Sequence, residues 1–325
     1  MTALQLLTIG RVSVDLYAEQ LGVRLAEVQT FAKSIGGSPT NVAVAAARLG
    51  TRSAVVTSVG DDEFGGYVCG ALQGFGVDTR FVGSHPTLLT PLAIAAMDPP
   101  ADPRLFFYRQ PSAPDEEIEL QDDHLAAARD AEIFWVAGSC LSGRLTGPTT
   151  RAMLEARGRK RHTVIDLDYR PTFWPSEEAA SREIGAAIDH ATAAVGNRRE
   201  CEVAVGTGDP DAAADALLER GIELAIVKLG GDGVLVAARD DRSRVEPVAV
   251  DVVCGLGAGD AFGGALCHAL LAGVDPAQAV RFANAAGAIV ASRLLCADAM
   301  PIEQEVLELL GEAKPAPTET SGAHA

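Results

Sequence analysis

Short apolar runs alternate with helix-like segments along most of the chain, and this alternation constrains the fold more than any other feature of the sequence. The strand-like runs are residues 4–10, 53–58, 133–137, 163–167, 192–195 and 224–229. Helical patterns cover residues 38–50, 63–75, 146–159, 263–271 and 276–293. Strands that alternate with helices pair in parallel, because a parallel connection needs a crossover of roughly a dozen residues or more. The sequence therefore predicts an α/β fold with a mainly parallel central sheet.

The alternation breaks between residues 88 and 110. Residues 92–97 and 104–109 are strand-like runs joined by a turn that contains Pro99, Pro100 and Pro103. Two consecutive strands without a helix between them indicate a hairpin. We therefore expect a β-flap separate from the main sheet, and short exposed strands within residues 21–34.

Composition narrows the class of protein. At 325 residues and 48% hydrophobic content, the chain is long enough to bury a large core. Its formal charge of −17, with 27 basic and 44 acidic residues and no basic run, argues against nucleic acid and anionic membranes as partners. The six cysteines form no CxxC pair, and no apolar run approaches the ~18 residues of a membrane span. We expect a reduced, cytoplasmic protein with a disordered tail over 313–325, and length alone leaves open whether the chain forms one large α/β domain or two smaller ones.

The stretch Cys254-Gly-Leu-Gly-Ala-Gly-Asp-Ala-Phe262 reads as a loop that leads directly into a helix. Gly257 and Gly259 allow the backbone to turn sharply, because glycine has no Cβ to clash. The free amides at the start of the helix, with the helix dipole behind them, would form a nest for an anion such as a transferring phosphate.

Asp260 is the unexpected member of this nest. A carboxylate among anion-binding amides is electrostatically unfavourable unless it has a chemical task. One such task is to accept the proton of a hydroxyl group that attacks phosphorus. The alternative is an aspartate that only caps the helix, and the loop alone does not separate the two.

A second informative stretch covers residues 36–50. Gly36 and Gly37, a serine cap and a proline at the first helical position predict a helix start, and Gly50 predicts its end. Asn41 lies in the first turn, where its amide would face a ligand or simply be a spare polar group.

Polar side chains follow successive predicted strands: Asp15, then residues 36–41, 166–170, 197–200 and 257–260. The carboxyl ends of parallel strands meet at one sheet edge, where ligands bind in open α/β folds. The clusters together predict a long cleft. Arg109, at the end of the flap, would clamp a carboxylate or phosphate through its fork, or else lie in solvent.

Gly36-Gly-Ser-Pro-Thr-Asn41 and Gly257-Ala-Gly-Asp-Ala-Phe262 resemble the paired signatures of the ribokinase-like (PfkB) carbohydrate kinases. The spacings Asn197-x-x-Glu200 and Lys228-x-Gly230-x-x-Gly233 also match that family, and the resemblance covers about residues 4–300. It implies one kinase domain over 1–312, built as an α/β/α sandwich with a small β-sheet lid from about residues 11–35 and 88–110. It further implies ATP and Mg²⁺ as cofactors, and a homodimer through the lid.

The resemblance also implies roles for individual residues. Asp260 would be the catalytic base, and the backbone of Gly257, Ala258 and Gly259 would hold the phosphates. The sugar would bind to Asp15, Gly36, Gly37, Asn41, Arg109 and Arg170. ATP would contact Asp168, Lys228, Gly230, Gly233 and Asn284, while Asn197 and Glu200 would position Mg²⁺ through water.

Four stretches are similar to the 5-dehydro-2-deoxygluconokinases of inositol catabolism: residues 10–17, 31–39, 107–109 and 296–301. The 2-keto-3-deoxygluconate kinases share the Tyr-Arg flap end and the pattern over 166–171. Either resemblance implies phosphorylation of the terminal hydroxyl of a keto-deoxy sugar acid, with Arg109 and Arg170 facing its carboxylate. A neutral sugar or nucleoside acceptor, and a sensor without activity, are the alternatives.

The sequence departs from the family pattern at three places. Many members carry an aspartate six residues before the base, at a loop that binds a monovalent cation, and here that residue is Cys254. Potassium activation is therefore left open. Asp168 stands where the pattern has asparagine, and the segment 109–115 differs from that of the 5-dehydro-2-deoxygluconokinases.

Overall fold

The computed structural model describes residues 4–100 and 103–312, so the predicted tail over 313–325 lies outside the described residues. Within them, the larger sheet has nine strands. In spatial order they are β13 (Arg242–Val245), β12 (Val234–Ala237), β11 (Leu224–Lys228), β10 (Ala193–Asn197), β9 (Thr163–Asp166), β8 (Ile133–Ala137), β1 (Leu6–Ile9), β4 (Ser53–Gly60) and β5 (Val82–His85). All neighbours from β11 to β5 are parallel, and β12 and β13 continue the sheet antiparallel.

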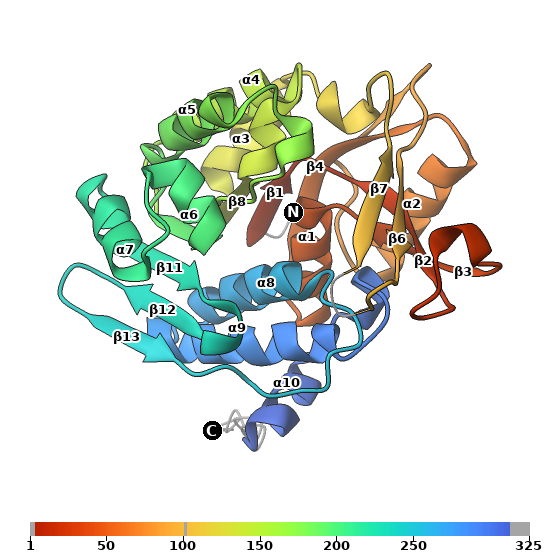
Figure 1. Ribbon diagram of the computed structural model, residues 1–325. Coiled ribbons are helices and arrows are strands. Elements are labelled where there is room, and N and C mark those ends of the chain that lie inside the picture. The colour runs from red at the N-terminus through yellow and green to blue at the C-terminus, as the bar shows by residue number, and fades with distance from the viewer. Residues whose placement is uncertain (1–3, 101–102, 313–325) are drawn as a thin grey trace, which may run out of the picture.

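Helices cover both faces of this sheet, as Figure 1 shows. One layer contains α3 (Asp122–Asp130), α4 (Thr146–Arg157), α5 (Glu177–Ile188), α6 (Arg198–Val205) and α7 (Pro210–Glu219). The other contains α1 (Ser38–Arg48), α8 (Ala258–Leu271), α9 (Pro276–Ala291) and α10 (Glu303–Leu310), while α2 (Glu63–Gly74) packs near β4. This is the predicted α/β/α sandwich.

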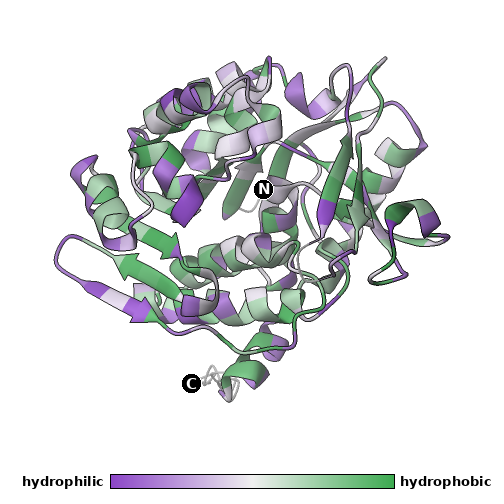
Figure 2. Ribbon diagram, in the orientation of Figure 1, coloured by the Kyte–Doolittle hydropathy of each residue, from purple (hydrophilic) through white to green (hydrophobic). Residues whose placement is uncertain are grey.

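The central strands are apolar along their whole length because both of their faces are covered. In β8, Phe134 and Val136 pack into the layer of α3–α7, and the alternate residues Ile133 and Trp135 pack into the layer of α1 and α8. Figure 2 shows β11 and β12 as mainly hydrophobic strands; β12 is apolar along its whole length, and β11 is apolar up to its last residue, Lys228.

A separate sheet of four strands forms the predicted lid, in the order β3 (Phe31–Gly36), β2 (Ser13–Ala18), β6 (Leu92–Ala96) and β7 (Arg104–Tyr108). β6 and β7 are the expected antiparallel hairpin, while β2 pairs parallel with β6. The sheet lies at one side of the sandwich (Figure 1).

Small residues let α1 and α8 pack very closely. A Cβ at Gly264 would lie 2.4 Å from the Cβ of Ala45 and 2.7 Å from the backbone of Ala46 and Val42, so only glycine fits there. This contact brings together the first turns of two helices that are more than two hundred residues apart in the sequence, and with them Asn41 and Asp260.

Three local predictions need correction. The N-cap of α1 is Gly37, with φ +97°, and Ser38 makes no capping bond. The helix expected over 263–271 already begins at Ala258, so the 257–260 motif forms its first turn. The segment 21–34 holds the short helix η1 (Leu25–Glu27) before β3. None of the helices within residues 4–100 and 103–312 is long and apolar enough to span a bilayer.

Candidate active site

The start of α8 has the geometry that an anion site requires. Gly257 is the N-cap with φ +80°, a left-handed conformation that glycine adopts without strain. No side chain caps this end, so the first amides of the helix are free of an internal acceptor. Gly259, in contrast, is helical, and a Cβ there would lie 3.7 Å from Nζ of Lys228.

Asp260 and Asn41 meet at this point. Asn41 Nδ2 donates a hydrogen bond of 2.8 Å to Oδ2 of Asp260. Burial raises the pKa of Asp260, against the hydrogen bonds from Asn41 and Ser38 that lower it. The Asn41 side chain is buried and its Oδ1 has no partner among the described residues, which leaves an acceptor for a ligand hydroxyl.

Asp15 lies on the lid strand β2 rather than at the end of β1, where the sequence suggested it. Ser13 Oγ donates to its Oδ1 at 2.6 Å, and Tyr17 donates to Oδ2 at 3.4 Å. A Cβ at Gly36 would lie 2.0 Å from Asp15 Oδ2, so this glycine makes room for the carboxyl group. Burial raises the pKa of Asp15 to about 6, and the charge of Asp260 adds to that shift. The two predicted site aspartates are therefore electrostatic neighbours.

Asp168 is held between two arginines. Arg11 Nη2 lies 3.0 Å from its Oδ2, and Arg170 Nε lies 2.9 Å from its Oδ1. Burial opposes ionisation, but Arg170 and Arg11 together bring the pKa of Asp168 below its usual range. The two arginines and Asp168 together carry one excess positive charge. The charge of Asp168, followed by those of Glu200 and Asp260, raises the pKa of the half-exposed Arg170.

Arg11 is a site residue that sequence reasoning missed. It is buried, its Nε donates to Ser139 Oγ at 3.1 Å, and its guanidinium lies over the ring of Phe173. Its position directly after the first strand was the only signal, and its partner Asp168 is 157 residues away.

Lys228 brings a further cation to the first turn of α8. Burial would lower the pKa of its ammonium, but the carboxylates of Asp166, Glu200 and Asp260 raise it overall. Asp166 in turn has a pKa raised by burial and opposed by Lys228. The amides of α8, Lys228 and Arg170 together can hold a strongly negative group.

Asn197 and Glu200, expected to position Mg²⁺, form a capping box at the start of α6. Glu200 N donates to Asn197 Oδ1 at 2.9 Å, and Asn197 N donates to Glu200 Oε2 at 2.7 Å. This arrangement satisfies two helix-end amides. It leaves Glu200 Oε1 for a water-mediated contact, so their role toward magnesium stays a prediction.

The predicted nucleotide residues Gly233 and Asn284 lie against one segment after β13. A Cβ at Gly233 would lie 2.2 Å from the carbonyl oxygen of Val245, and Asn284 Nδ2 donates to the carbonyl of Glu246 at 3.2 Å. Gly230 and Gly233 both have positive φ, at the turn between β11 and β12. Gly233 and Asn284 therefore lie against two successive residues, and their role toward a nucleotide stays a prediction.

Arg109 is not free in this structure. Its Nη2 lies 2.5 Å from Asp115 Oδ1 and its Nε lies 2.9 Å from Glu116 Oε1, and its side chain is 7% exposed. Its contact with a substrate carboxylate stays a prediction, because a substrate would have to replace Glu116, the more exposed of the two carboxylates.

Cys254 lies in an apolar cluster with Tyr17, Met97 and Cys296. Burial raises the pKa of its thiol. A neutral thiol in apolar surroundings offers none of the oxygen ligands that hard cations prefer. The side chain of Cys254 therefore supplies no oxygen ligand to a cation, and potassium activation stays an open question.

Comparison with known proteins places this site in context. The model of the pfkB family carbohydrate kinases matches residues 3–303. A 5-dehydro-2-deoxygluconokinase of Photobacterium profundum is 32% identical over an alignment of 316 residues, and the alignment covers 94% of this chain and 95% of the relative.

Two solved fructokinases have the same fold. That of Xylella fastidiosa, solved with bound ATP, has 27% identity, a TM-score of 0.80 and coverage of 94% of this chain and 98% of its own. That of Vibrio cholerae, solved with fructose, ADP and calcium ion, has 26% identity, a TM-score of 0.81 and coverage of 94% of this chain and 99% of its own. This chain is a carbohydrate kinase and belongs to the pfkB family.

Proposed function

We propose that the chain transfers the terminal phosphoryl group of ATP to the terminal hydroxyl of a keto-deoxy sugar acid, with 5-dehydro-2-deoxy-D-gluconate as the favoured acceptor. The observation that carries this proposal is the position of Asp260. At this position a carboxylate of raised pKa lies at a helix end whose first amides have no side-chain cap. It is hydrogen-bonded to Asn41, whose Oδ1 has no partner among the described residues.

The proposed chemistry uses few groups. The sugar hydroxyl attacks the terminal phosphorus, the bond from that phosphorus to the departing ADP oxygen breaks, and the hydroxyl proton passes to Asp260. The backbone amides from Gly257 to Gly259, with Lys228 and Arg170, stabilise the negative charge on the transferring group. Asp15 and Asn41 orient the sugar, and the lid excludes water, which would otherwise compete as acceptor.

Magnesium fits the site only through water. Among the described residues no three His, Cys, Asp or Glu side chains are placed to hold a metal. Mg²⁺ usually keeps several waters and contacts one or two carboxylates together with substrate phosphates. Glu200, with one oxygen outside the capping box, and Asn197 would hold such a water. The ion would neutralise phosphate charge.

Arginine side chains near the site favour a substrate that carries a carboxylate. Arg170 carries the excess charge beside Asp168, and Arg109 lines a hollow of about 520 Å³ between β7 and the segment of Phe173. The similarity to 5-dehydro-2-deoxygluconokinases over most of the chain favours that acceptor. 2-Keto-3-deoxygluconate presents the same carboxylate and is the second candidate.

An assay of ADP release with Mg-ATP would test the proposal. It would compare 5-dehydro-2-deoxygluconate, 2-keto-3-deoxygluconate, fructose, ribose and adenosine, and we expect the highest kcat/KM for the first. Asp260→Asn should keep ATP binding and reduce kcat by about 10²–10⁴-fold, the usual contribution of general-base catalysis. Near-normal turnover of that variant would exclude the mechanism, and a preference for fructose would exclude the acid substrate.

A further inference from the structure

Four chain segments join the lid sheet to the rest of the molecule, and two of them end at the same place. The segment Gly10–Val12 leads from β1 into β2, the lid strand that carries Asp15. The segment that begins at Arg109 leads from β7 back to the short helix η2 (Pro114–Glu116). Both segments contact one side chain of η2, that of Asp115.

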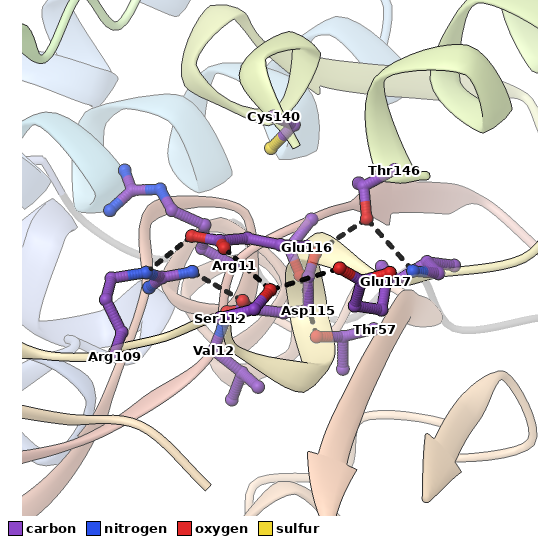
Figure 3. A network of polar contacts seen from close by, with 12 residues as sticks. Arg11, Val12, Thr57, Arg109, Ser112, Asp115, Glu116, Glu117, Cys140 and Thr146 are labelled. Atoms are coloured by element: carbon purple, nitrogen blue, oxygen red, sulfur yellow. Dashed lines mark hydrogen bonds and ion pairs between the residues drawn. The ribbon is translucent and has the colours of Figure 1, made fainter. Parts of the chain in front are cut away.

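Asp115 binds each of these segments with one carboxylate oxygen (Figure 3). Its Oδ2 accepts a hydrogen bond of 2.8 Å from the backbone amide of Val12, and its Oδ1 lies 2.5 Å from Nη2 of Arg109. The Asp115 side chain is fully buried. Because a buried carboxylate is costly without partners, both contacts should be persistent.

The helix that carries Asp115 is itself fixed to the sandwich. Thr146, the first residue of α4, donates from Oγ1 to the carbonyl oxygen of Asp115 at 2.7 Å and accepts from the amide of Ile118 at 3.1 Å. Glu116 adds a second carboxylate to Arg109 (Figure 3). Asp115 therefore transmits the position of α4 to both lid segments.

The β1–β2 segment is held from other sides as well. Thr57 donates to the carbonyl of Gly10 at 2.7 Å, and Thr40 donates to the carbonyl of Arg11 at 2.9 Å. Asp115 adds a contact at Val12, the last residue before β2 begins. The position of Val12 therefore helps to set the position of Asp15, which lies three residues further along β2 and near Asp260.

We propose that Asp115 is a positioning residue for the kinase reaction: it holds two of the four segments that join the lid to the sandwich, so that Asp15 meets the sugar opposite Asp260. Asp115 does not touch the reactants in this arrangement. Its contribution to turnover rests on the proposed function, whereas its hold on the lid can be tested separately.

Asp115→Asn is the decisive variant. The asparagine amide has the same size but only one oxygen. If that oxygen accepts from the Val12 amide, its NH₂ group faces the Arg109 guanidinium, which is also a donor. If the oxygen faces Arg109, the Val12 amide has no acceptor. We expect faster hydrogen exchange in peptides covering residues 10–18. We also expect KM for the sugar acid to rise about tenfold or more while KM for ATP stays within about twofold, as for the loss of one charge-assisted hydrogen bond.

Glu117→Gln is the matched control. Glu117 follows η2 directly and pairs with the exposed Arg144. It also accepts a hydrogen bond of 3.1 Å from Ser112 Oγ, which a glutamine can still accept, and its side chain is hydrogen-bonded to neither Val12 nor Arg109. The control should leave both the exchange of residues 10–18 and the two KM values unchanged. Thr146→Val is a milder second variant, which loosens η2 without removing a charge and should raise the same exchange rates to a smaller extent.

The outcomes separate the proposals. Unchanged exchange at residues 10–18 in both Asp115→Asn and Thr146→Val would overturn the positioning role. So would an equal rise of both KM values, or faster exchange along the whole chain, since either would mean a general structural role. If the wild-type protein phosphorylates no sugar acid, the proposed function fails, while the exchange data still decide whether Asp115 holds the lid.

Discussion

Replacement of Gly257 by alanine tests the geometry of the predicted phosphate loop. Gly257 has φ +80°, a conformation that costs an L-residue roughly 1–2 kcal/mol. Its new Cβ would also lie 2.6 Å from Sγ and 3.0 Å from Cβ of Cys296. Such an overlap in a packed region costs about 1–3 kcal/mol. We therefore expect the free energy of unfolding to fall by about 2–5 kcal/mol.

Urea denaturation of Gly257→Ala, Cys296→Ala and the double variant would measure the two contributions. Removal of the Cys296 sulfur should recover part of the overlap cost in the double variant, but none of the backbone cost. Gly259→Ala is the control for stability, because Gly259 is helical and its Cβ would meet Lys228 only at 3.7 Å. That variant should match or slightly exceed the stability of the wild type.

The same substitution should also affect turnover. A displacement of the first α8 amides by about 1 Å would reduce kcat by roughly 100-fold. ADP release by the folded variant, measured well below its transition temperature, would show this loss. If Gly257→Ala unfolds within about 0.5 kcal/mol of the wild type and keeps its kcat, the loop does not have the conformation described above.

Three further predictions concern other parts of the molecule. A carboxylate of raised pKa takes up its proton at higher pH, so kcat/KM should fall as the pH drops through about 6, where Asp15 is protonated. Protonation of Asp260, whose pKa is also raised, should add to the loss of activity at acid pH. A kcat/KM that stays constant down to about pH 5 would contradict this prediction. Gly264→Ala should lower the free energy of unfolding by about 1–3 kcal/mol because its Cβ overlaps α1, whereas Gly70→Ala, in open space on α2, should not lower it. Asn197→Ala should lower the free energy of unfolding by about 1 kcal/mol, because the N-cap of α6 is lost, and should raise the Mg²⁺ concentration that gives half the maximal rate. An unchanged magnesium requirement would mean that Asn197 only caps the helix.

Much of the fold could be predicted because its signals are local. Strand-like and helix-like runs follow from the side-chain period of each segment, and glycine at 37 and 257 follows from backbone angles that other residues avoid. The separation of the lid was predictable for the same reason, since the hairpin over 92–109 interrupts the alternation. Element ends were less accurate: the start of α8 was misplaced because its first turn is rich in glycine.

The partners of the charged side chains were not predictable in the same way. The sequence indicated Asp260 and Asn41 separately, but their hydrogen bond depends on how closely α1 packs against α8. Arg109 was expected to face a ligand or to lie in solvent, and the structure pairs it with Asp115 and Glu116, partners that the sequence did not indicate.

The sequence by itself thus determined the order of strands and helices, the family resemblance and the residue types at the phosphate loop, since these depend on short-range periodicity and backbone conformation. Only the tertiary structure decided which charges neutralise one another. Arg11 and Asp168 are 157 residues apart and lie in contact because β1 and the segment after β9 end at the same edge of the sheet. Electrostatic interactions depend on distance in space and on burial, and neither can be read from separation along the chain.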